Sequence, residues 1–273
     1  MRPLVVVAAI VVALLAILAY GYAEALRDPV VRSIRLAESS WPSDAAPIRL
    51  VLMSDMHVQG PDMPPARLAR IVAAVNKLDA DIVVLAGDYT ASTYLPTRTY
   101  SLFDAVQPLG SLKAKTAKIA VLGNHDRNDP AESRAALESV GLAVLENEAI
   151  QLGPLAIGAV HWGLKKALKQ LRERHGTKIL VAHSPDPFAR LPDDISLMLA
   201  GHTHCGQIVL PIVGALATGS KYGSRYMCGV VQRPDNMLIV SAGLGTSRLP
   251  VRLGAPPDIW LISLEPAQVG KAH

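Results

Sequence analysis

The chain has 273 residues, of which 50% are hydrophobic and only 4% are aromatic. Apart from an apolar N-terminal segment, this length suits one large α/β domain with a core of Val, Leu, Ile and Ala. The net charge of +4, from 27 basic and 23 acidic residues without a block of like charge, does not indicate nucleic-acid binding. Two cysteines are too few for a disulfide scaffold and do not settle the redox compartment.

Residues 1–25 predict a transmembrane anchor. The run 3–22 carries no charge, and about 20 apolar residues span a bilayer as a helix. Arg2 precedes the run and charges of both signs follow it, so the positive-inside rule does not fix its orientation. We expect an uncleaved N-in anchor, with a cleaved signal peptide ending at Ala23-Glu24-Ala25 as the alternative. Both arrangements place the following domain outside the cytoplasm.

Residues 26–47 contain three prolines and scattered charges without a clean period, which predicts a linker or an edge strand. Ordered structure is expected to begin near Ile48, with one domain over 48–266 and a tail at 267–273. Apolar runs alternate with helical patterns in that domain and later give way to strand and turn signals, which predicts a layered α/β fold with two packed mixed β-sheets flanked by helices. The expected strands are 48–53, 82–86, 118–122, 178–182, 195–200, 237–241 and 259–264, and the expected helices are 65–78, 131–140 and 164–175.

The segment 164–175 predicts a basic amphipathic helix, because five Lys and Arg side chains surround three leucines. We interpret it as a solvated outer helix of the domain. Contact with anionic lipid headgroups is the alternative, motivated by the anchor that precedes the domain.

A polar cluster follows each of five expected strands. In an open α/β sheet, ligands bind outside the carboxyl ends of the strands, so clusters far apart in sequence can converge there. Imidazole and carboxylate groups suit borderline and hard divalent ions, which makes Mn, Fe, Zn or Co the expected metals. The clusters are Ser54-Asp55-Met56-His57, Gly87-Asp88, Gly123-Asn124-His125-Asp126, His183 and Gly201-His202-Thr203-His204.

These residues suit a site for two divalent ions. The two oxygens of Asp88 can bridge two cations, and cations about 3.5–4 Å apart can clamp the attacking and leaving oxygens of a phosphoryl transfer. With neutral imidazoles and two carboxylates, such a site keeps a net positive charge and favours an anionic phosphate.

In this order the motifs D-x-H, G-D, G-N-H-D, H and G-H-x-H resemble the calcineurin-like metallophosphoesterase family over residues 55–204. The resemblance implies the layered fold of that family and a phosphodiesterase that hydrolyses a P–O bond by in-line attack of metal-bound hydroxide. It implies that His125 faces the scissile phosphate as a catalytic residue and that Asp126 orients it. It also implies one ion held by Asp55, His57, Asp88 and His204, and a second ion held by Asp88, Asn124, His183 and His202.

The N-terminal anchor, the G-N-H-D form, His183-Ser184-Pro185-Asp186 and the run 241–247 resemble a bacterial subgroup of membrane-anchored phosphodiesterases. This implies a bacterial inner (cytoplasmic) membrane location, with the domain on the periplasmic side and a phosphoester substrate, lipid-linked in some relatives. One alternative is an enzyme of lipid A synthesis that cleaves the pyrophosphate of UDP-2,3-diacylglucosamine, which requires a cytoplasmic domain. The motifs are also compatible with a non-catalytic metal-binding module and with a protein phosphatase. The natural substrate and the oligomeric state stay open.

Three further expectations concern the surroundings of the site. His161, after a candidate strand at 155–160, is interpreted as structural, with a place at the pocket rim beside Trp162 as the alternative. Cys205 is expected to be buried as a small apolar side chain, with oxidation or soft-metal binding as the alternative. The substrate-binding residues are unknown, and the candidates in nearby loops are Tyr89, Tyr94, Arg98, Tyr222 and Arg225.

Overall fold

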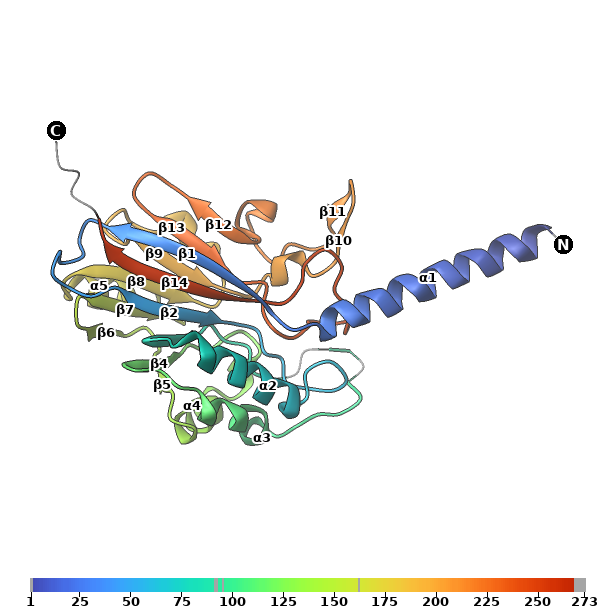
Figure 1. The fold of residues 1–273 in the computed structure, drawn as a ribbon, viewed down its shortest axis with the longest axis horizontal. Helices are drawn as coiled ribbons and strands as arrows, with labels where there is room; N and C mark the ends of the chain where they lie inside the picture. The colour runs from blue at the N-terminus through green and yellow to red at the C-terminus, as the bar shows by residue number, and fades with distance from the viewer. Residues whose placement is uncertain (1, 91–92, 95, 162, 268–273) are drawn as a thin grey trace.

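Two six-stranded sheets form the body of the computed structural model, which describes residues 2–267 except 91, 92, 95 and 162. Figure 1 shows the sheets stacked on one another, with a long helix standing away from them. The first sheet has the order β1-β14-β2-β3-β4-β5 and the second has the order β12-β13-β9-β8-β7-β6. The predicted α/β fold of two mixed sheets flanked by helices is confirmed.

The elements have the following bounds. The first sheet contains β1 (Val30–Glu38), β2 (Ile48–Met53), β3 (Ile82–Leu85), β4 (Ala117–Ala120), β5 (Ala143–Val144) and β14 (Asp258–Pro266). The second contains β6 (Ala149–Leu152), β7 (Leu155–Val160), β8 (Thr177–Ala182), β9 (Leu197–Ala200), β12 (Gly229–Gln232) and β13 (Met237–Val240). A separate hairpin pairs β10 (Val209–Leu210) with β11 (Gly214–Ala215). The α-helices are α1 (Arg2–Leu26), α2 (Pro65–Val75), α3 (Leu102–Val106), α4 (Pro130–Ser139) and α5 (Leu164–Arg172).

The central strands are apolar on both faces because both faces are covered. In β2, Leu50 and Leu52 point into the layer between the two sheets, while Val51 and Met53 face the layer under α2, α3 and α4. This is the period-2 alternation of a strand placed between two apolar layers. A third layer lies between the second sheet and α5, where Leu171 packs beside Gly158.

The helix α5 lies on the outer face of the second sheet, at the end of the domain far from α1 (Figure 1). Its apolar side chains are buried, and Arg172 on its exposed side forms an ion pair with Asp194. Its position agrees with the interpretation as an outer helix of the domain.

Ordered structure begins earlier than Ile48, so that expectation was wrong. Strand β1 runs parallel to β14 over its whole length, from the pair Val30 and Asp258 to the pair Glu38 and Pro266. The nine-residue β14 pairs with β2 over only the segment 260–264, and β1 covers its other edge. β1 is thus the edge strand of the first sheet, which was the alternative to a linker for this segment.

The strand directions place α1 and the carboxyl ends of the central strands at the same edge. Strands β2, β3 and β4 are mutually parallel, β14 runs against β2, and β1 runs with β14. The start of β1, directly after α1, therefore lies where β2, β3 and β4 end. The end of α1 is fixed to the domain, because the Arg252 amide donates to the Gly21 carbonyl over 2.8 Å and Arg67 Nη2 donates to the Arg27 carbonyl over 2.8 Å.

Helix α1 is long and apolar enough over 3–26 to cross a membrane, with a mean hydropathy of 2.9 and 6% of that window buried. In Figure 1 it projects from the domain as an isolated rod.

Removing β1 should destabilise the domain. A chain that begins at Ser40 loses Leu36 and Ile34 from the layer between the sheets. We expect its free energy of unfolding to fall by about 2–5 kcal/mol relative to a chain that begins at Asp28. Urea unfolding followed by tryptophan fluorescence measures the difference. Equal midpoints for the two shortened chains would contradict a structural role for β1.

Candidate metal centre

Five of the predicted metal ligands have backbone conformations that non-glycine residues rarely adopt. The φ angles are 51° at Asp55, 43° at His57, 60° at Asp88, 73° at His202 and 50° at His204. Such residues cost conformational free energy and persist only where the surrounding structure holds them, which is common at functional sites. The loops after β2, β3 and β9 are therefore shaped to aim these side chains.

Two glycines let the loops approach one another. A Cβ added at Gly201 would overlap Ser54 Oγ and the Asp55 carboxylate. A Cβ added at Gly123 would overlap the Asp88 carboxylate. Only glycine leaves room for a carboxylate against a neighbouring backbone here.

The first group of ligand atoms comes from Asp55, His57 and His204, which lie within 4.8 Å of one another and are buried. The Nε2 atoms of His57 and His204 are 3.1 Å apart. His204 Nε2 also lies 3.5 Å from Asp55 Oδ1. The structure thus brings together three of the four residues predicted for the first ion.

The second group comes from Asp88, His183 and His202. His183 Nε2 lies 3.1 Å from Asp88 Oδ2 and 3.1 Å from His202 Nδ1. Asn124 Oδ1 is 3.1 Å from the same His183 nitrogen. All four residues predicted for the second ion are therefore adjacent.

Asp88 lies between the two groups. Its Oδ2 is 3.1 Å from His183 Nε2 and 3.6 Å from His57 Nε2. This position fits the bridging carboxylate that the motifs predicted.

The donor set fits a divalent ion in each group. His57 Nδ1 lies 3.0 Å from the Thr90 carbonyl and His183 Nδ1 lies 2.7 Å from the Ala86 carbonyl. A ring nitrogen that donates to a carbonyl leaves the other ring nitrogen for the site, so Nε2 of both residues is positioned to bind a cation once it carries no proton. Ligand atoms that share one ion at bonds of about 2.1 Å lie roughly 3 Å apart, which matches the distances within each group.

The protonation states also suit metal binding. Burial raises the pKa of Asp55, but the imidazoles of His204 and His183 outweigh it and hold that pKa below its usual value. Burial likewise raises the pKa of Asp88. The charge and hydrogen bond of His183 lower that pKa by more, so it lies below its usual value. Burial lowers the pKa of His204 to about 3. Charged carboxylates and a neutral imidazole are the forms that bind a cation.

The carboxylate of Asp126 lies against three backbone amides. Its Oδ2 accepts the amides of Asp88 and Gly123 over 2.7 and 2.8 Å, and its Oδ1 accepts the amide of Tyr89 over 2.9 Å. Burial and the nearby charge of Asp88 raise its pKa to about 6. Asp126 therefore joins the loops after β3 and β4, and its role in orienting His125 stays a prediction.

His125 lies at the mouth of the site. Its Nε2 is 4.0 Å from Asp88 Oδ2, and 35% of its side chain is exposed. Its amide donates to Asp88 Oδ1 over 2.9 Å, so its backbone supports the bridging carboxylate while its ring faces outward. The ring lines a cavity of about 500 Å³ with His202, His204, Tyr94 and Leu249.

Arg252 is a residue of the site that the sequence reasoning missed. Its buried guanidinium donates to the carbonyls of Ala242, Gly243 and Gly245, and its Nη2 lies 3.4 Å from His204 Nδ1. The run 241–247 stood out in the sequence, but nothing in it pointed to an arginine as the partner of its carbonyls.

Cys205 is buried in an apolar cluster, as expected, and it is also oxidised, which was the alternative. Cys205 is bonded to Cys228, which ties the turn after His204 to the segment before β12. Thr203 reinforces this link, since its Oγ1 donates to the Met227 carbonyl over 2.6 Å.

Three further expectations near the site concern His161, Tyr89 and Tyr94. His161 is buried at the end of β7 with its Nδ1 3.0 Å from Glu146 Oε2, which agrees with a structural role, and Trp162 lies outside the described residues. Tyr89 is buried with its hydroxyl 3.0 Å from the Val121 carbonyl, so it was wrongly named as a substrate contact. Tyr94 does line the cavity.

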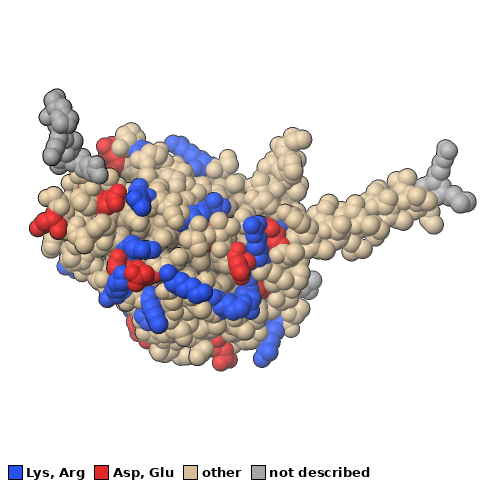
Figure 2. All heavy atoms as spheres, in the orientation of Figure 1, with Lys and Arg blue, Asp and Glu red and all other residues tan. Residues whose placement is uncertain are grey.

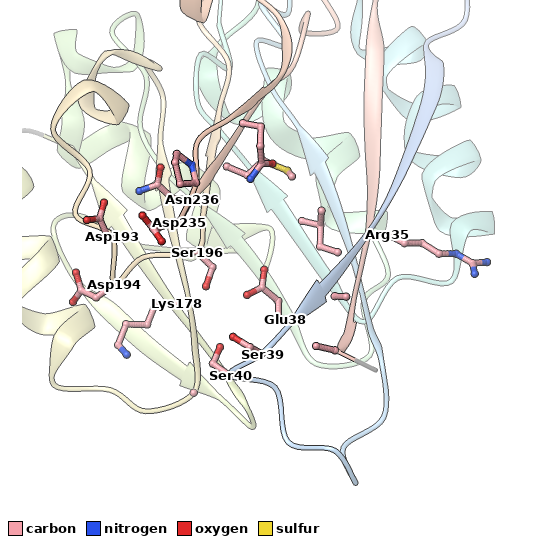
Figure 3. Close-up of a pocket in the computed structure, with 17 residues that line it drawn as sticks. Arg35, Glu38, Ser39, Ser40, Lys178, Asp193, Asp194, Ser196, Asp235 and Asn236 are labelled. Atoms are coloured by element: carbon pink, nitrogen blue, oxygen red, sulfur yellow. The ribbon is translucent and has the colours of Figure 1, made fainter. Parts of the chain in front are cut away.

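A larger hollow, of about 700 Å³, lies away from these ligands. Figure 3 shows charged side chains around it, among them Glu38, Lys178, Asp194 and Asp235. Its lining residues come from the end of β1 and the starts of β8 and β13, at the edge of the sheets opposite the metal centre.

Comparison with known proteins settles the family. Residues 48–206 match the family model described as calcineurin-like phosphoesterase. The chain belongs to the calcineurin-like phosphoesterase family. Its two Asp/His groups are the metal-binding candidates expected of this family from the motifs.

Several metallophosphoesterases resemble the chain over most of its length. A Danio rerio protein, "Transmembrane protein with metallophosphoesterase domain", is 30% identical over 96% of this chain and 63% of its own length, so the chain spans less than two thirds of it. The uncharacterized metallophosphoesterase YkuE of Bacillus subtilis is 29% identical over 90% of each chain. The phosphodiesterase YaeI of Escherichia coli is 26% identical over 90% of this chain and 92% of its own.

The close approach at Gly201 gives a test of the centre. In a Gly201→Ala variant, the new methyl group should displace the Asp55 carboxylate and lower metal affinity by about 10–100-fold. Gly110→Ala is the matched control, because its nearest new contact is Val140 Cβ at 3.5 Å. Metal titration of both purified variants measures the effect, and unchanged affinity in Gly201→Ala would contradict the geometry of this loop.

Proposed function

We propose that the protein is a phosphodiesterase with two divalent metal ions, of Mn, Fe, Zn or Co. The observation that carries the proposal is the pair of buried donor groups with Asp88 between them. When bound, two such ions neutralise the charge of a phosphate and lower the pKa of water, which supplies a nucleophile near neutral pH. One ion is assigned to Asp55, His57, Asp88 and His204, and the other to Asp88, Asn124, His183 and His202.

His125 is proposed as the catalytic acid. Its ring is partly exposed, lines the cavity and lies beside the bridging carboxylate, while its backbone supports that carboxylate. A proton held on Nε2 is within reach of a leaving oxygen on a phosphate seated over the two groups.

A diester fits the cavity better than a monoester. Ile208, Leu216 and Leu249 line the cavity beside the histidines and offer an apolar surface to a second ester substituent. The similarity to a protein named as a phosphodiesterase supports the same choice.

We further propose that α1 anchors the protein in a bacterial inner membrane with the domain on the periplasmic side. The Cys205–Cys228 bond supports this orientation, because disulfides persist in oxidising compartments and are rare in the cytosol. It counts against a cytoplasmic enzyme of lipid A synthesis. Relatives named as transmembrane proteins support the anchor.

Hydrolysis assays test the activity. The full chain in detergent, stripped of metal, is given Mn, Fe, Zn or Co with bis-p-nitrophenyl phosphate or p-nitrophenyl phosphate. We expect metal-restored cleavage with preference for the diester, and a loss of about 100-fold or more in Asp88→Asn.

His125→Ala is the informative companion variant. It removes the proposed acid but keeps the backbone amide that supports Asp88, so metal content should stay normal while kcat falls by about 10²–10⁴-fold. A folded, metal-loaded protein that cleaves neither ester would favour the non-catalytic module, and monoester preference would favour a phosphatase.

Alkylation in intact cells tests the topology. Cys205 and Cys228 should resist a thiol reagent until reductant is added, and protease added outside spheroplasts should digest the domain. Free thiols in a protease-protected domain would place it in the cytoplasm and restore the lipid A alternative.

A further inference from the structure

The hairpin of β10 and β11 is an exposed apolar element. Residues 208–217 read I-V-L-P-I-V-G-A-L-A, and each of these described residues is at least partly exposed. Ile212 at the tip is fully exposed, and Val213 and Leu216 are 71% and 61% exposed. Large contiguous apolar patches on a protein surface mark contact with another protein or with a membrane.

The hairpin lies directly beside the end of α1. The Val209 amide donates to the Leu253 carbonyl over 2.8 Å, and the neighbouring Arg252 amide donates to the Gly21 carbonyl of α1. In Figure 1 the hairpin and the end of α1 lie on the same side of the domain, and Figure 2 shows the protruding hairpin in the same uncharged tan as α1. Adjacent residues of one segment therefore hold both apolar elements at the same edge of the domain.

The same edge carries the mouth of the metal centre. Ile208 and Leu216 of the hairpin line the cavity that contains His202 and His204. Leu249 and Arg248, both exposed, lie on the same rim. The hollow at the opposite edge is instead surrounded by charged side chains (Figure 3).

We propose that the hairpin 208–217 inserts into the lipid interface beside α1 and holds the mouth of the metal centre against the bilayer. A bilayer is the occupant that explains the position, because an apolar surface next to a helix long enough to cross a membrane is continuous with the lipid-facing surface of that helix. Exposed Arg248 on the rim suits the phosphate level of the headgroups. The inference rests on the proposed anchor and is independent of the proposed reaction.

Quenching by lipid tests the proposal. The full chain, with a single added cysteine carrying an environment-sensitive fluorophore, is reconstituted in phosphatidylcholine–phosphatidylglycerol vesicles with brominated acyl chains. The native cysteines form a disulfide and leave the added thiol free to react. We expect strong quenching at Ile212→Cys and Leu216→Cys, and none at Asp235→Cys in the exposed turn before β13, at the opposite edge.

A label at Leu14→Cys in α1 distinguishes failure of the hairpin proposal from failure of the proposed membrane anchor. Quenching at Leu14→Cys without quenching at either hairpin position would overturn the hairpin proposal and leave the anchor intact, whereas no quenching at Leu14→Cys would remove both. A hairpin label that is shielded from water yet unquenched, and that cross-links to a second copy, would show a protein interface and also overturn it. Thermal unfolding of each labelled chain confirms that the fold is kept.

Discussion

The structure depends on holding two carboxylates and four imidazoles together in a largely buried site. Asp55 and Asp88 carry like charges and repel each other. Ring nitrogens that face one another with lone pairs repel as well, unless a positive charge lies between them. In the chain without metal, a proton on His183 supplies part of this positive charge. Burial lowers the pKa of His183, but the Asp88 carboxylate outweighs burial and raises that pKa to about 9. A divalent ion supplies more positive charge than a proton does. Much of the surrounding structure therefore serves to keep the predicted cation ligands in place.

That architecture stabilises the ligands through backbone contacts. Left-handed residues aim the side chains, glycines let the loops close on one another, and the buried Asp126 ties two loops together through three amides. Arg252 does the same for the late loop through three carbonyls. These groups keep the site residues in place, although the left-handed backbone and the burial of polar side chains both cost free energy.

The sequence predicted which polar residues come together because their signal is local. Each polar cluster directly follows a run of apolar residues, and the rule that carboxyl ends of parallel strands share an edge brings them together without any knowledge of loop conformation. Strand β1 was not recognised as a firm element because its residues alternate between partly buried and exposed, a pattern that a linker can imitate. The amide contacts of Asp126, the position of Arg252 and the Cys205–Cys228 bond depend on how loops fold back over 23 to 48 residues, which no periodicity records.

Arg252 contacts both α1 and the candidate metal centre, so α1 is connected to the centre as well as to the body of the domain. One amide joins this residue to the Gly21 carbonyl, while its side chain reaches His204. A chain shortened to remove α1 loses the partner of that amide, whereas the guanidinium keeps its hydrogen bonds to the carbonyls of the late loop. A comparison of the full chain with such a shortened chain therefore compares two centres in which the Arg252 backbone is held differently, while the side chain beside His204 is held alike.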